Sequence, residues 1–191
     1  MSTEIELSWI PTEPNPDLTP EQNDRLVAAA HQLVTEGYEN LVEPGDAVGL
    51  GQSYFDALQE MAVRYYRSQR YDDAAVLYQR LLQLKPMQLD YYKGLGACYL
   101  GQQRYDAAVR AYESASFFDA LDAELHYYMG LAYYFQKKFE PAFDVMRFAR
   151  VLDERAANPD SKIAAFATQM LERMKPLVSP EQAALIDKRP D

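Results

Sequence analysis

The stretch YKGLGACYLGQQRYDAAVRAY, residues 92–112, contains the pattern that decides the fold. Its Tyr99 has counterparts at Tyr65 and Tyr133, which lie at equal distances before and after it in the sequence. Other positions recur at the same interval and keep a similar side-chain type or size. These series are Ala62, Gly96 and Gly130; Met61, Leu95 and Met129; Ala74, Ala108 and Ala142; Tyr78, Tyr112 and Met146; Leu81, Ala115 and Ala149. Three contiguous copies without an insertion indicate an internal repeat.

The period and the residue types match the tetratricopeptide signature, in which each repeat is a pair of helices. Positions 4, 7, 8 and 11 of each copy form an i, i+3, i+4, i+7 stripe, which predicts the buried face of a first helix. A small residue at position 8 allows the second helix to approach closely. Because one pair cannot bury its apolar face alone, neighbouring pairs must stack. We therefore expect an all-α fold, a tetratricopeptide-repeat solenoid of three helix pairs over about 55–88, 89–122 and 123–156.

The segments outside the repeats predict an additional helix on each side of them. Thr19-Pro20-Glu21-Gln22 has the chemistry of a capping box and begins an N-terminal helix over about 20–36, followed by a connector over 38–52. Residues 161–175 predict a helix that caps the C-terminal end of the stack, and Ser179 begins a short tail helix. The expected organisation is a flexible arm (1–18), a tetratricopeptide domain (19–176) and a tail (177–191).

The amino-acid composition limits the kinds of partner and the cellular compartment that we expect for this chain. The net charge of −10 argues against a nucleic-acid partner. No window approaches 18 consecutive apolar residues, and the N-terminus lacks a basic region followed by an apolar one, so we expect neither a membrane span nor a secretory signal. Cys98 is the only cysteine, which excludes an intrachain disulfide and favours a reducing compartment. A cytoplasmic location is the expectation.

The sequence offers no pattern typical of an enzyme, a metal site or a cofactor site. His31 and His126 are far apart, and His126 occupies a repeat packing position, which favours a buried histidine with satisfied hydrogen bonds. The glycines at 94 and 96 and at 49 and 51 lack the lysine and the preceding strand of a phosphate loop. Cys98 lies in the middle of a predicted helix and is expected to be a packed side chain. We expect no catalytic residue, no metal and no cofactor.

A candidate peptide-binding groove follows from the positions that do not face the core. In tetratricopeptide stacks the first helices line the concave surface, where positions 5, 9 and 12 are apolar or aromatic here, except for Gln59 and Lys93. A contiguous apolar patch usually marks a binding site. The alternative is that the N-terminal helix or the capping helix fills this surface as core. The groove residues predicted from these positions are Val63, Tyr66, Lys93, Ala97, Leu100, Tyr127, Leu131 and Tyr134.

Residues 78–85 and 92–98, YQRLLQLK and YKGLGAC, resemble the class II chaperones of bacterial type III secretion systems, and so does the arrangement of helices over roughly 20–176. The resemblance implies a cytoplasmic, non-catalytic chaperone with a role in virulence. Such a protein would keep hydrophobic translocator proteins soluble by holding an extended, proline-flanked segment in the concave groove. The resemblance also implies that Tyr71 is one of the groove residues. The basic carboxylate clamp of another tetratricopeptide subclass is absent, because Gln59, Val63, Gly94, Glu124 and Tyr128 occupy its positions. A generic tetratricopeptide scaffold or assembly factor is the alternative.

The helix over 20–36 carries an apolar stripe that nothing else in the sequence obviously covers. Members of the resembled family are often dimeric, so the stripe predicts a homodimer contact. Its residues are Leu26, Val27, Ala30, Leu33 and Val34.

Overall fold

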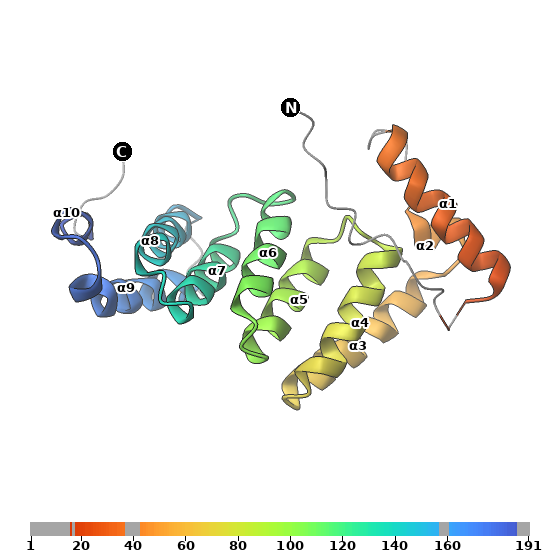
Figure 1. Cartoon of the computed structure of the whole chain (residues 1–191), viewed down its shortest axis with the longest axis horizontal. Helices are drawn as coiled ribbons and strands as arrows, with labels where there is room; N and C mark the ends of the chain where they lie inside the picture. Colours follow the sequence, from red (N-terminus) through yellow and green to blue (C-terminus); the bar gives the residue numbers. More distant parts are fainter. Residues whose placement is uncertain (1–15, 17, 37–42, 157–160, 187–191) are drawn as a thin grey trace. The chain divides into compact units, whose positions relative to one another are not determined.

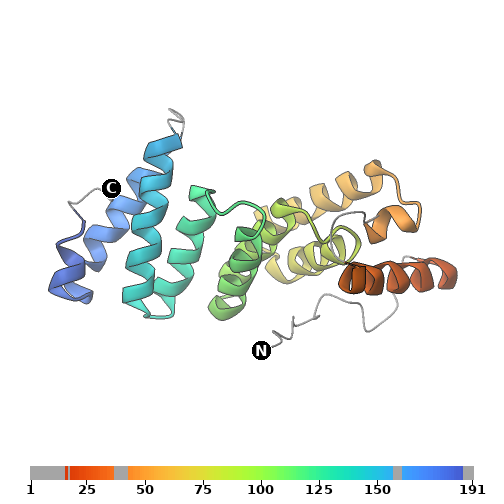
Figure 2. The same cartoon turned by 90° about the horizontal axis from the view of Figure 1, so that it is seen from above.

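The structure is a computed structural model that describes residues 16, 18–36, 43–156 and 161–186. Within these residues the regular elements are all helices, and the predicted all-α class is confirmed (Figures 1 and 2). The helices are α1 Pro20–Glu36, α2 Pro44–Ala47, α3 Gln52–Arg67, α4 Tyr71–Leu84, α5 Leu89–Gly101, α6 Tyr105–Ser116, α7 Ala123–Phe135, α8 Phe139–Ala156, α9 Ile163–Met174 and α10 Pro180–Ala183, with the 3-10 turn η1 Lys175–Leu177 between the last two.

The chain divides into two compact units, one up to Tyr91 and one from Tyr92 onward. Unit 1 contains α1 to α4, and unit 2 contains α6 to α10 together with all but the first turn of α5. The predicted repeats appear as the helix pairs α3–α4, α5–α6 and α7–α8. Nearly all of the predicted arm, positions 37–42 of the connector and the end of the tail lie outside the described residues.

Each repeat turns from its first helix to its second through the same backbone geometry. Gln69, Gln103 and Lys137 have left-handed φ values of 60°, 61° and 63°, and each is one repeat period from the next. In unit 1 the amide of Arg70 donates to the carbonyl of Tyr65 at 2.9 Å, and the amide of Gln69 donates to that of Tyr66 at 2.9 Å. This pair of bonds is the Schellman motif that ends many helices. The periodic tyrosine therefore marks the last turn of each first helix.

The small residue at position 8 performs the role predicted for it. A Cβ placed on Gly96 would lie 2.8 Å from the ring of Tyr112, and one on Gly130 would lie 2.8 Å from Cγ of Met146. Real Cβ atoms essentially never come this close to another group. The repeated pairing of a small residue on the first helix with Tyr112 or Met146 on the second thus fixes the distance between the helices of a pair.

The N-terminal helices pack against the first repeat inside unit 1. The predicted capping box is present: the Thr19 amide donates to Oε1 of Gln22 at 2.9 Å, and the Gln22 amide donates to Oγ1 of Thr19 at 3.2 Å. The α2 turn lies on Phe55, because a Cβ on Gly45 would be 2.5 Å from that ring. Phe55 is fully buried, so the connector closes the apolar start of α3.

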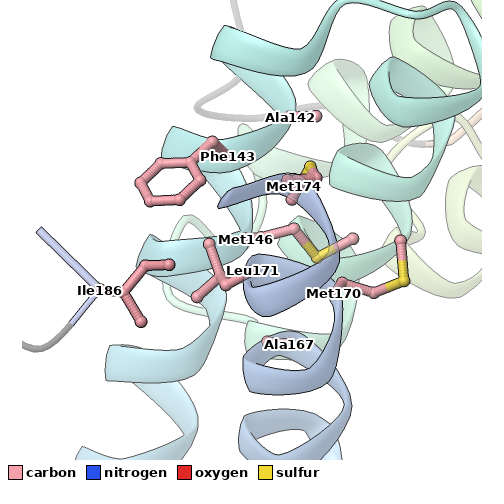
Figure 3. Close-up of a cluster of buried hydrophobic side chains, with 8 residues drawn as sticks. All are labelled: Ala142, Phe143, Met146, Ala167, Met170, Leu171, Met174 and Ile186. Carbon is pink, nitrogen blue, oxygen red and sulfur yellow. The ribbon is translucent and has the colours of Figure 1, made fainter. Parts of the chain in front are cut away.

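The C-terminal helix α9 covers the third repeat in unit 2. Ala167, Met170, Leu171 and Met174 of α9 pack with Ala142, Phe143 and Met146 of α8 and with Ile186 of the tail (Figure 3). The tail is held by Arg150, whose guanidinium donates to the carbonyl of Ile186 at 2.8 Å. The side chain of Ser179 accepts from the Gln182 amide at 3.2 Å, as predicted for the helix that begins there. The apolar end of the stack is thereby closed.

Candidate functional site

The predicted groove residues of unit 1 lie at the C-terminal end of α3 and the start of α4. Val63 is half-buried, while the side chain of Tyr66 is 39% exposed. The rings of Tyr66 and Tyr71 meet edge to face, with centroids 5.5 Å apart. The structure therefore brings these two tyrosines together in one partly exposed aromatic pair, with Val63 on the preceding turn of the helix.

Tyr71 has aromatic counterparts in the other repeats that the sequence prediction missed. Tyr134 meets Phe139 at 5.7 Å in the same edge-to-face geometry, and Tyr105 stacks on Phe135 at 5.4 Å. Tyr105 and Phe139 follow Tyr71 by one and two repeat periods, so the period itself contained the signal. Aromatic rings thus line the turn from first to second helix in each pair.

The predicted groove residues of α5 include a cation that is already paired. Lys93 Nζ lies 2.7 Å from Oδ2 of Asp122 and 2.7 Å from Oε2 of Glu124. Asp122 also caps α7, because its side chain accepts from the amide of Leu125 at 3.0 Å. Ala97 and Leu100 on the following turns are half-buried. Lys93 therefore joins α5 to the start of α7, and its charge is neutralised within unit 2.

Opposing effects set the pKa values of this ion pair. Burial lowers the pKa of Lys93, but its hydrogen bonds to Asp122 and Glu124 and their negative charges outweigh burial, so the pKa is raised. Burial raises the pKa of Asp122, but the hydrogen bond from Lys93, the Leu125 amide and the lysine charge outweigh it, so the pKa is lowered. Both groups stay charged over the whole neutral range.

The predicted groove residues of α7 are partly covered within their own unit. Tyr127, Leu131 and Tyr134 are half-buried and pack against the cluster formed by α8 and α9. The ring of Tyr127 lies 6.2 Å from that of Phe166 on α9. For these three residues the geometry corresponds to the alternative in which the capping helix covers the surface. Of the predicted groove residues only Tyr66 on α3 is exposed, and those of α5 are half-buried like those of α7.

Cys98 and His126, the side chains that were considered as candidates for catalysis or metal binding, are both buried. Burial raises the pKa of the Cys98 thiol to about 12, which keeps it protonated. Nε2 of His126 lies 2.8 Å from the carbonyl oxygen of Ala120, and its ring meets Phe148 edge to face at 4.8 Å. Among the described residues, no group of three or more His, Cys, Asp or Glu side chains could hold a metal ion. Within the same part of the chain, no helix is long and apolar enough to cross a membrane.

The stripe predicted for dimerisation lies on α1. Leu26 is fully buried inside unit 1, so it is not available on an exposed surface, whereas Val27 is 37% exposed. The side chains of Ala30, Leu33 and Val34 lie outside the described part of the chain. Only Val27 is thus placed by the structure at a surface.

Comparison with known proteins agrees with this architecture. The family model described as tetratricopeptide repeat matches residues 65–142. No curated protein sequence matches the chain. Solved structures do match, and the chain spans nearly the whole length of several of them.

PcrH, a protein from Pseudomonas aeruginosa, is among these similar structures. PcrH in complex with the chaperone binding region of PopD is 25% identical, with a TM-score of 0.63 over 68% of this chain and 96% of that chain. PcrH with the chaperone binding region of PopB is 26% identical, with a TM-score of 0.60 over 64% and 98%. The type III secretion translocator chaperone SycD from Yersinia enterocolitica shares the fold at 24% identity, with a TM-score of 0.63 over 66% and 96%. The resemblance to translocator chaperones of the tetratricopeptide type is confirmed.

Proposed function

We propose that this chain is a non-catalytic chaperone for hydrophobic translocator proteins of a type III secretion system. The observation that carries the proposal is the similarity to PcrH, which was solved with the chaperone binding regions of PopD and PopB bound. The similarity extends over 96% and 98% of the PcrH chains, so it includes their whole helical arrangement. In this role the chain acts in the bacterial cytoplasm, before its substrate is exported.

The mechanism is occlusion of apolar side chains by the first helices of the repeats. Tyr66 with Tyr71 in unit 1, and Ala97 with Leu100 in unit 2, present partly exposed apolar surface on α3, α4 and α5. An extended segment can lay alternate side chains on either of these surfaces, each taken within its own unit, while its other side chains remain in solvent. Aromatic residues at an interface bury much area at a small cost in conformational entropy. Binding would keep the segment from aggregating or entering a membrane.

The local electrostatics favour an apolar segment over a carboxylate terminus. The one lysine among the groove residues, Lys93, is bound by two carboxylates at 2.7 Å. Glu124 itself adds negative charge where a carboxylate-binding surface needs positive charge. A partner that is recognised through its C-terminal carboxylate is therefore disfavoured at α5, which leaves apolar contacts as the source of affinity.

Co-expression tests the function. Candidate translocators encoded in the same genome, each containing a hydrophobic segment, are produced with and without this chain. The proposal expects them to remain soluble and to co-purify as a complex only when the chain is present. Equal precipitation in both cases contradicts the proposal. A chain carrying Ala97→Glu should fail to protect the substrate, because it places a charge on the apolar surface, while Ala107→Glu on α6, also half-buried, serves as the matched control.

We also propose that the chain forms a homodimer through α1. The support is the 37% exposed Val27 on that helix and a structure of SycD described as an alternative dimer. Val27→Glu should convert the dimer to a monomer in light scattering, because a charge on a small apolar contact is costly. Ala28→Glu, an exposed neighbour on a different face of the helix, should leave the dimer intact. A dimer that persists in Val27→Glu would place the contact elsewhere.

A further inference from the structure

The connection between α6 and α7 presents the most exposed large apolar side chains in the described part of the chain (Figure 1). Phe117 is 89% exposed, Leu121 is 70% exposed and Phe118 is 41% exposed. All three belong to unit 2, and none is among the predicted groove residues. We call these three side chains the α6–α7 apolar surface. Exposed apolar side chains that gather in one place mark an interaction site, whereas single ones need no explanation.

The repeat period shows that the exposure of Phe117 is not part of the repeat architecture. The same position holds Gln83 one period earlier and Val151 one period later. Gln83 is polar, and Val151 is only 7% exposed. The other two repeats therefore place either a polar or a covered side chain here, and the second repeat alone places an apolar side chain in solvent.

Hydrogen bonds and a ring contact hold the connection in one conformation. The Phe118 amide donates to the carbonyl of Ala115 at 3.0 Å, and the Leu121 amide donates to Oδ1 of Asp119 at 2.9 Å. The ring of Phe118 stacks on that of Tyr92, with centroids 5.5 Å apart. Because the connection is already ordered, little of its conformational entropy is lost when a partner binds.

Carboxylates border the α6–α7 apolar surface. Asp119 lies within the connection and is exposed, Asp122 is the N-cap of α7, and Glu124 lies in the first turn of α7. Lys93 of α5 is the cation bonded to them, at 2.7 Å from both Asp122 and Glu124. Three carboxylates thus face one cation, and the border has a net negative charge.

The flanking helices do not reverse the sign of this border. In the last two turns of α6, Arg110 and Glu113 are both exposed and carry opposite charges. Phe148 of α8 meets the ring of His126, which in turn bonds the Ala120 carbonyl of the connection. The charged residues of α8 within two turns of Phe148 also balance, and they are Asp144, Arg147, Arg150, Asp153, Glu154 and Arg155.

The negative border selects among possible partners. In a two-fold contact each surface meets its own copy, so a second copy of this chain would set carboxylates against carboxylates. The exposed fractions correspond to roughly 400 Å² of apolar surface, so such a pair would bury about 800 Å², less than the roughly 1,200 Å² of a stable interface. An anionic lipid surface is repelled in the same way. A cationic segment with an apolar face instead gains attraction from the same carboxylates.

We propose that the α6–α7 apolar surface binds a cationic amphipathic helix of a partner protein. Phe117 and Leu121 insert between apolar side chains of that helix, and its lysines or arginines lie beside Asp119 and the carboxylates at the start of α7. The contact uses none of the apolar groove residues. It is therefore independent of the proposed function, and each of the two can fail without the other.

A pair of designed peptides tests the proposal on the full-length protein. The probe is a labelled helical peptide of about five turns, with leucines on one face and lysines on the other. The comparison peptide has glutamate in place of every lysine. Fluorescence anisotropy at about 0.15 M salt, where long-range attraction is screened, measures binding. The leucine–lysine peptide should bind, and the leucine–glutamate peptide should not.

Variants of the surface locate the contact. The double variant Phe117→Ser and Leu121→Ser keeps every charge and should weaken binding of the leucine–lysine peptide by about tenfold or more. Asp119→Asn keeps an acceptor for the Leu121 amide and should weaken it about threefold. Val76→Ser, on α4 and 53% exposed, is the matched control and should bind like the wild type. Because the substituted phenylalanine and leucine are exposed, the double variant should melt at the wild-type temperature.

Unchanged affinity for the leucine–lysine peptide in the double variant would overturn the inference, and so would equal binding of the leucine–glutamate peptide. A lower melting temperature of the double variant would overturn it as well, because the two side chains would then be packed within the folded protein. A wild-type oligomer in light scattering that the double variant loses would assign the surface to a second copy. A labelled translocator segment should bind the double variant and the wild type equally, and a loss of that binding would make the surface part of the groove.

Discussion

The turns between the helices of each repeat allow a prediction about stability with a definite sign. Gln69, Gln103 and Lys137 adopt left-handed φ values of 60°, 61° and 63°, a region that costs an L-residue about 1–2 kcal/mol and costs glycine essentially nothing. Each of the three is the residue that follows the C-cap in a Schellman motif, where glycine is the usual choice. Replacing all three by glycine should therefore stabilise the protein.

The magnitude follows from two opposing terms. Glycine relieves about 1–2 kcal/mol of backbone strain at each turn but loses roughly 0.5–1 kcal/mol more conformational entropy on folding than other residues. The net gain is about 0.5–1 kcal/mol for each substitution. The three turns are separate and share no partner, so their effects should add to about 2 kcal/mol. For a chain of this length, that gain corresponds to a rise in the melting temperature of roughly 4–8 °C.

Thermal and urea unfolding, followed by helical circular dichroism, measure the effect. Ser68→Gly is the control, because this C-cap residue has φ −85° and ψ 10°, where glycine brings no relief of strain. The control should lower the stability by about 0.5–1 kcal/mol, so neighbouring positions in one turn should respond with opposite signs. A triple glycine variant that melts at or below the temperature of the wild type would refute the reasoning.

Three further predictions concern side chains inside the repeats. Gly96→Ala should destabilise the wild type by about 1 kcal/mol, because the new Cβ would lie 2.8 Å from the Tyr112 ring. In a Tyr112→Leu variant the ring is absent, so the same change should stabilise the helix. Urea unfolding of the wild type, the two single variants and the double variant measures both effects. Asp122→Asn keeps the α7 cap but removes the ion pair with Lys93. Because the pKa of Asp122 is lowered in the folded protein, the ion pair stabilises the fold fully above the unfolded aspartate pKa of about 4. That stabilisation is lost as the pH falls through the lowered pKa of the folded state. The stability difference between wild type and Asp122→Asn should accordingly shrink in acid unfolding titrations, and a difference that is constant with pH would contradict the assignment. Cys98 should resist alkylation by iodoacetamide in the native protein at pH 8 and react only on unfolding, as mass spectrometry would show, since burial raises its pKa to about 12.

The repeats were predictable because their determinants are local and periodic. The small residue of each repeat predicts a close approach of the second helix at Gly96 and Gly130, and the structure shows that approach, with Tyr112 and Met146 as the contacting side chains. The capping box at Thr19 was also predictable from the sequence, because its two hydrogen bonds join residues that are three positions apart. Local pattern and observed structure therefore agree at this helix end and in these two helix pairs.

The features that were not predicted depend on longer separations or on unusual residue choices. Lys93 forms ion pairs with Asp122 and Glu124, which are 29 and 31 residues away in the sequence. No local sequence pattern indicates that pairing. The left-handed turn residues are glutamine and lysine, which carry none of the signal that glycine would. The partial covering of Tyr127 results from α9 packing back on the third repeat, and the sequence left that alternative open.

Binding of a translocator segment to the first helices is tested most directly by a fluorescence anisotropy titration with wild type, Tyr66→Ala, Ala97→Glu and their controls Val76→Ala and Ala107→Glu. The ligand is a labelled, proline-flanked N-terminal segment of a translocator from the same genome. Tyr66→Ala should weaken binding by about 2 kcal/mol, or roughly 30-fold, if it is an interface hot spot, and Ala97→Glu should weaken it at least as much. The two controls should bind like the wild type, and all five proteins should retain the same helical circular dichroism. Unchanged affinity in both Tyr66→Ala and Ala97→Glu would contradict a binding site on the first helices.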